Sequence, residues 1–104
     1  MAWVYLLFAG ILEIVWAFAM KQSDGFTKLV PTAVTLVALV ASLALLALAM
    51  KSLPLGTAYA IWTGIGALGA FAVGVLVLGE PLHALRAGAA AMILGGLVLM
   101  KVAP

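Results

Sequence analysis

The sequence predicts an all-α membrane protein in which one domain, residues 1–104, holds four transmembrane helices. Of the 104 residues, 68% are hydrophobic and only 8% are charged, and the mean hydropathy is +1.38. A soluble domain carries about 25% charged residues and could not bury this much apolar surface. The apolar residues fall into four stretches, each close to the ~20 residues that cross a bilayer as a helix. We therefore expect a chain that lies almost wholly within the lipid bilayer.

The first expected helix covers about residues 2–20 and contains one ionisable residue, Glu13, near its midpoint. At ~1.5 Å per residue this helix is roughly 28 Å long, which matches the hydrocarbon thickness of a bilayer. An acid at that depth costs at least ~2.5 kcal/mol, so it is by default a functional-site hypothesis. Ala17-Phe18-Ala19 imitates a signal-peptide cleavage site, but no Lys or Arg precedes the apolar stretch. We expect the segment to be a retained transmembrane helix.

The other three helices are expected at about residues 29–50, 57–78 and 84–102. Pro31 stands in the first turn of the second helix, where proline is tolerated, and Thr57 is the expected N-cap of the third. The breaks between helices are too short for a folded domain outside the membrane. They hold ionisable residues that we expect to be solvated, namely Asp24, Glu80, His83 and Arg86.

Composition excludes several classes of function. The chain has no cysteine, which removes disulfides, thiolate metal sites and thiol nucleophiles. Its five cations, which give a net charge of +2, are too few and too scattered for a nucleic-acid surface. We expect no enzymatic activity, no cofactor, no metal site and no nucleic-acid partner.

The distribution of Lys and Arg barely favours either orientation of the chain in the membrane. With four spans, Lys51 and Lys101 lie on one side of the membrane, and Lys21, Lys28 and Arg86 lie on the other. Because the Lys and Arg bias between the two sides sets orientation, a difference of one cation predicts insertion both ways up. We expect opposed copies to pair as an antiparallel, dual-topology homodimer. The alternative is that one extra cation suffices and all copies face the same way.

Polar and small residues of the first two helices surround Glu13. Gly10 and Trp16 lie three residues away on the same helix face, where Gly10 leaves space and the Trp16 indole N–H is able to bond the carboxylate. The alternative is that Trp16 is a bulky side chain that faces the lipid and has no role in the site. Ser42, near mid-depth of the second helix, is a candidate partner of a group beside Glu13, or else bonds a carbonyl of its own helix.

The third helix presents aromatic and hydroxyl groups, and the fourth presents small residues. Tyr59, Trp62, Thr63 and Gly66 share one face, which would wall a cation site, unless the aromatics form a membrane-interface belt. Gly64 and Gly66 belong to a GxGxxG match that is spurious inside a transmembrane helix and instead permits close packing or a bend. On the fourth helix, the small residues that predict a dimer contact are Gly88, Ala91 and Gly95.

These features predict a mechanism. Glu13 has no cation in its own span, and desolvation favours its neutral form, so a proton and a cationic solute would compete for it. Alternate exposure of the site to each side would make that competition an exchange. Two opposed copies would supply eight helices and two carboxylates, and would reproduce the inverted repeat of larger transporters.

Three motifs resemble the small multidrug resistance family over essentially the whole chain: Gly10-x-x-Glu13-x-x-Trp16-Ala17, the run from Pro54 to Gly66, and Glu80-Pro81. The first motif, with Ser42 and Lys101, is similar to the guanidinium-exporter subtype. The resemblance implies an antiparallel homodimer of the bacterial inner membrane that exchanges protons for guanidinium ion or small substituted guanidines. It also implies that Glu13 of both protomers binds the substrate, in a site lined or ordered by Gly10, Trp16, Ser42, Tyr59 and Trp62.

Other functions stay open at this point. A promiscuous exporter of quaternary-ammonium or hydrophobic cations would use the same acid with an aromatic cage. A small dual-topology ion channel would share the size, the charge balance and the number of helices, but should show an unbroken polar lining. A non-transporting membrane subunit would pair Glu13 with a cation in the span of another protein.

Overall fold

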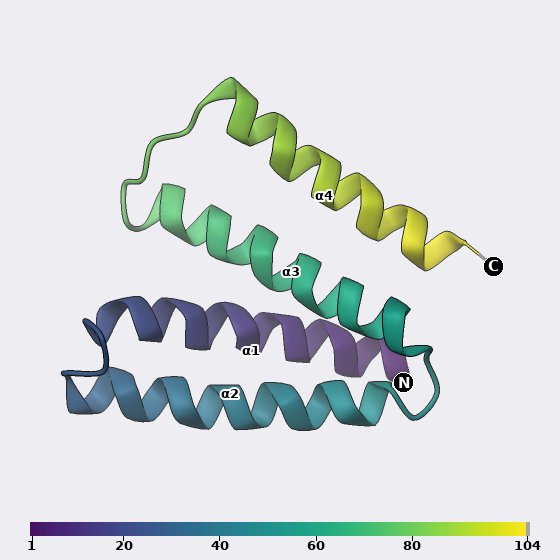
Figure 1. The fold of residues 1–104 in the computed structure, drawn as a ribbon, viewed down its shortest axis with the longest axis horizontal. Coiled ribbons are helices and arrows are strands. Elements are labelled where there is room, and N and C mark those ends of the chain that lie inside the picture. The colour runs from purple at the N-terminus through teal and green to yellow at the C-terminus, as the bar shows by residue number, and fades with distance from the viewer. Residues whose placement is uncertain (104) are drawn as a thin grey trace.

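The computed structural model describes residues 1–103 and contains four helices joined by short connections (Figure 1). The helices are α1 (Ala2–Gln22), α2 (Leu29–Ala49), α3 (Leu55–Leu76) and α4 (Ala84–Val102). Each is long and apolar enough to cross a membrane. No strand occurs within residues 1–103. The predicted all-α membrane fold of four helices is confirmed.

The helix ends differ from expectation by a few residues. α1 continues to Gln22, and α3 begins at Leu55 and ends at Leu76. The expected N-cap at Thr57 is wrong, because Pro54 takes that position and its carbonyl accepts the N–H of Ala58 at 3.0 Å. Pro54 lacks an N–H of its own, so the start of a helix is where a proline costs least.

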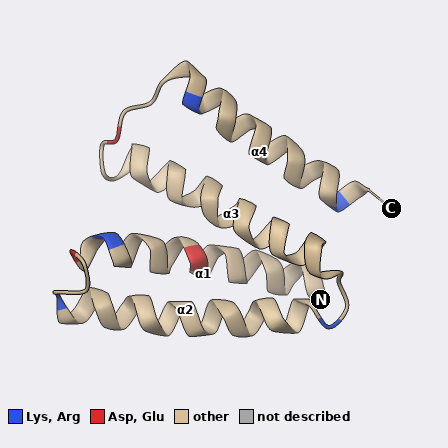
Figure 2. Cartoon of the chain, viewed as in Figure 1, with Lys and Arg blue, Asp and Glu red and all other residues tan. Residues whose placement is uncertain are grey.

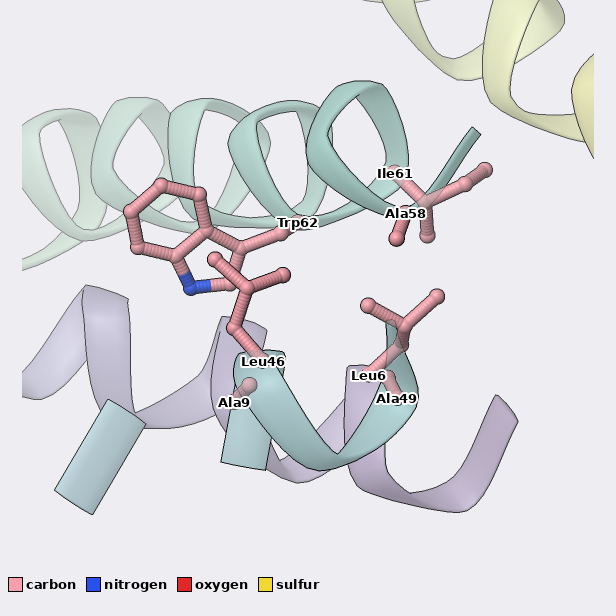
Figure 3. Packing of buried hydrophobic residues seen from close by; sticks show 7 residues of the cluster. All are labelled: Leu6, Ala9, Leu46, Ala49, Ala58, Ile61 and Trp62. Carbon is pink, nitrogen blue, oxygen red and sulfur yellow. The ribbon is translucent and has the colours of Figure 1, made fainter. Parts of the chain in front are cut away.

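The core lies where α1, α2 and α3 meet, near the end of the bundle that holds the N-terminus (Figure 3). α1 packs against both α2 and α3, whereas α2 and α3 touch only briefly. The buried hydrophobic cluster consists of Leu6, Ala9, Leu46, Ala49, Ala58, Ile61 and Trp62. α1 is therefore the central helix of the chain, and it carries Glu13.

α4 is attached differently from the other helices. Its backbone packs against α3 alone, it has no buried residue, and its Lys101 side chain reaches Trp3 of α1. Figure 1 shows α4 on the far side of α3 from α1 and α2. One close contact with α3 is made by the Leu97 side chain, which lies so near Gly64 that a Cβ there would collide with it. Most of the surface of α4 is free to meet lipid or another chain.

Charged residues lie at helix ends and in the connections, with Glu13 as the exception in the middle of α1 (Figure 2). Asp24, Glu80 and His83 are exposed connection residues, as predicted. Arg86 is also exposed but belongs to the first turn of α4 rather than to a loop. The interior of the bundle is thus apolar apart from Glu13 and a few uncharged polar side chains.

Candidate functional site

Glu13 projects from the middle of α1 against the backbone of α3. Its carboxylate lies so close to Gly66 that any Cβ at position 66 would overlap it. Glu13 is half-buried, and its Oε1 atom is buried with no hydrogen-bond partner among residues 1–103. Buried polar atoms are normally paired, so this oxygen is an acceptor able to take a proton or an N–H donor.

Trp16 lies one turn from Glu13 but does not bond it. The indole Nε1 is buried and unpaired within the described residues, and the ring packs beside the hydrophobic cluster. The predicted hydrogen bond between Trp16 and the Glu13 carboxylate is therefore absent from this structure. Because the indole N–H stands on the ring, its direction is set by how the ring packs and not by helix spacing alone. A buried donor and a buried acceptor thus lie unpaired on the same helix.

Ser42 and Trp62 form a chain of hydrogen bonds that joins three helices. The Ser42 hydroxyl donates to the Ala9 carbonyl of α1 at 2.7 Å, and the Trp62 indole Nε1 donates to the Ser42 Oγ at 3.0 Å. Both side chains are buried. The alternative that Ser42 bonds its own helix is wrong here, whereas Thr35 does so, to the Pro31 carbonyl at 2.8 Å. Ser42 fixes α2 and α3 against α1, one turn from Glu13.

We expect Ser42→Ala to destabilise the chain by about 0.5–2 kcal/mol, because it leaves the buried Trp62 N–H unpaired. Trp62→Phe should cost more, because it loses the same hydrogen bond and also leaves a cavity in the core. The double variant should cost less than the sum of the two single variants, since both remove the same hydrogen bond. Unfolding in mixed detergent measures this. Strictly additive losses would show that Ser42 and Trp62 act independently.

The expected aromatic face of α3 is divided between the interior and the surface of the single chain. Trp62 and Gly66 are buried, but Tyr59 and Thr63 are exposed. The Tyr59 and Trp62 rings lie 5.5 Å apart between centroids, at an angle of 51°. Tyr59 therefore continues the aromatic surface outward from the buried Trp62, and a cation wall made by all four residues would require a second chain to face them.

Side chains of neighbouring helices fill the space beside the glycines near the site. Gly10 lies against Ile65 of α3, so a Cβ at position 10 would overlap that side chain. The space that Gly10 leaves, which a ligand or another part of the protein could use, is taken by Ile65 and lets α1 pack closely on α3. Neither Ile65 nor the Ala9 carbonyl could be predicted from the sequence, since an ordinary aliphatic side chain and a backbone acceptor carry no local signal.

The predicted dimer face of α4 is open. Gly88, Ala91 and Gly95 are exposed, and a Cβ at Gly88 or Gly95 would meet no atom within 4 Å. This stripe therefore has no partner within the described part of the chain. It has room for close approach by another helix.

Comparison with known proteins assigns the chain to a protein family. A family model described as Small Multidrug Resistance protein matches residues 1–99. The chain belongs to the Small Multidrug Resistance family. Its four spanning helices and this membership make it a multi-pass protein of the bacterial inner membrane.

Several curated relatives of this Small Multidrug Resistance chain have the same name. A "Guanidinium exporter" of Yersinia pestis is 52% identical over 103 residues, which cover 99% of both proteins. Proteins of the same name from Escherichia coli (strain K12) and Salmonella typhimurium (strain LT2) are 50% identical over 101 residues, covering 97% of this chain and 96% of each relative. The predicted resemblance to the guanidinium-exporter subtype is confirmed.

Proposed function

We propose that this chain exports guanidinium ion in exchange for protons, and that both ions bind Glu13 in turn. The observation that carries the proposal is the Glu13 carboxylate, placed mid-span against Gly66 with one oxygen buried and unpaired. Guanidinium is planar and rich in N–H donors, so paired carboxylate oxygens suit it. The names of the curated relatives support the same substrate.

The proposal requires two chains in opposite orientation. A single chain offers one carboxylate and leaves Tyr59, Thr63 and the whole of α4 uncovered. An antiparallel copy packed along the Gly88, Ala91 and Gly95 stripe would bring a second Glu13 to mid-membrane. Exchange of the two protomers' conformations would then expose the site to each side in turn. The near-equal distribution of Lys and Arg supports insertion in both orientations.

Purified protein in liposomes tests this function. An outward proton gradient should drive guanidinium uptake, and an imposed guanidinium gradient should move protons the opposite way. An ion channel would instead carry guanidinium current without proton movement. A promiscuous exporter of hydrophobic cations would transport tetraalkylammonium ions as well as guanidinium, and a non-transporting subunit would transport neither.

One groove is a candidate binding site for the apolar tail of a substituted guanidine. It lies between α1 and α2, has a volume of about 360 Å³, and is lined by Leu12 beside the Glu13 position and by apolar residues of α2 that include Val34 and Val37. Glu13 itself does not line the groove, since adjacent residues of a helix point to different faces. Only the apolar tail of a guanidinium bound at Glu13, extending around α1, would reach the groove. We propose that the α2 side of the groove sets how large a tail is accepted.

Val37→Trp should narrow this groove while leaving the carboxylate intact. We expect transport of a guanidine with an alkyl tail to fall about tenfold, since two buried methylenes are worth about that factor, with transport of guanidinium ion itself almost unchanged. Val40→Trp adds the same bulk on α2 outside the groove and is the control. Equal loss for both substrates would show that the groove does not hold the tail.

A further inference from the structure

A second groove, which Glu13 does not line, lies at the end of the bundle where α1 begins and α4 ends. It has a volume of about 450 Å³. Its lining is apolar apart from one cation at its edge and includes Trp3, Leu7, Ile61, Ile65, Val98 and Lys101. α1 and α4 form its two sides, their backbones do not approach closely, and α3 lies between them.

Lys101 gives this groove its charge. Its Nζ lies 4.8 Å from the centroid of the Trp3 ring, a cation–π contact that holds the ammonium across the groove from α4 to α1. No Asp or Glu side chain lies on this side of the membrane, because Asp24 and Glu80 belong to the two connections on the opposite side. Within residues 1–103, the Lys101 ammonium is therefore a cation at the membrane surface with no Asp or Glu side chain on the same side.

We propose that this groove binds an anionic phospholipid, with the lipid phosphate on the Lys101 ammonium and the upper part of one acyl chain along the apolar wall. Basic pockets between transmembrane helices at the membrane surface are suited to anionic headgroups. The Trp3 ring, at the level of the headgroups, would pack beside the glycerol region.

The size of the groove favours a lipid over a second copy of the chain. Its lining covers residues 3–7 of α1 and 97–102 of α4, which is only about 6–8 Å along the helix axes. A helix with its side chains is ~10 Å across and needs a longer seam to pack. An acyl chain is narrower and continues from such a short groove into the bilayer.

Native mass spectrometry of the full chain with equal amounts of phosphatidylglycerol and phosphatidylcholine tests the proposal. We expect phosphatidylglycerol to be retained about fivefold better, the factor one cation near the membrane surface provides. Lys101→Gln should remove the preference, and Val4→Trp should lower retention of both lipids by filling the groove. Val4 is an exposed position of α1, away from the small-residue stripe of α4, so the added bulk need not disturb the core or that stripe.

Two matched variants keep the test specific. Lys51→Gln removes a cation from the same side of the membrane but outside the groove, and Val30→Trp adds bulk at an exposed position of α2. Both should bind lipid as the unaltered chain does. Equal retention of the two lipids by the unaltered chain, or no effect of Lys101→Gln, would overturn the proposal.

Photo-crosslinking identifies the occupant directly. Because the chain has no cysteine, Val4→Cys introduces a single thiol in the groove, away from the small-residue stripe of α4, that can carry a benzophenone. Crosslinked phospholipid is the expected product in liposomes of phosphatidylglycerol and phosphatidylcholine. A crosslinked second chain as the main product would show that another copy covers the groove, and would refute lipid binding there.

Discussion

Glu13→Gln is expected to abolish proton-coupled guanidinium transport. The amide keeps the shape of the side chain against Gly66 but neither binds nor releases a proton. Loss of a charge-assisted hydrogen bond, worth about 1.5–3 kcal/mol, should also weaken guanidinium binding roughly tenfold to hundredfold. Fluxes of guanidinium and protons in liposomes, measured in parallel, check both effects.

Glu80→Gln is the matched control, since it makes the same chemical change at an exposed carboxylate outside the helices. Transport should continue in this variant at close to the rate of the unaltered protein. If Glu13→Gln retained proton-coupled transport while Glu80→Gln lost it, the site would have been placed at the wrong acid.

Variants locked in one orientation should be inactive alone and active together. Ser52→Arg with Lys28→Gln and Arg86→Gln places three cations on one side and one on the other, whereas Gln22→Lys with Lys51→Gln gives the opposite bias of four to one. Each variant should lose nearly all transport when expressed by itself, because no opposed copy is available. Co-expression should restore transport to a large fraction of the original level.

The two variants must be present in the membrane in equal amounts, and a reporter on the C-terminus verifies the orientation of each. Full activity of either locked variant alone would contradict the antiparallel pair. It would leave a parallel assembly or a single chain as the transporting unit.

The fold could be predicted because its signal is local and repeated. Each span is a run of about 20 apolar residues, and the bilayer sets that length without reference to the other spans. The ends of α3 were harder, since Leu55 and Gly56 read as part of a polar break although Pro54 already starts the helix. How far α4 stands from α1 depends on packing between helices, which hydropathy does not encode.

The site could be predicted in its residue types but not in all of its contacts. An acid in mid-span is visible in any hydropathy reading, and Glu13 lies where it was expected. The partner of Ser42 is the Ala9 carbonyl, an acceptor found on every residue, so only the register of α2 on α1 identifies it. Trp16 failed to bond Glu13 because spacing on a helix brings two residues to one face without orienting the ring.

The measurement closest to the central claim is proton release on guanidinium binding by the purified protein in weakly buffered solution. If the two ions compete for Glu13, added guanidinium should displace protons when the carboxyl is protonated. The apparent affinity for guanidinium should then fall as the pH is lowered, by about tenfold per pH unit for each competing proton. Guanidinium binding that releases no proton and keeps one affinity between about pH 5 and pH 9 would contradict the account.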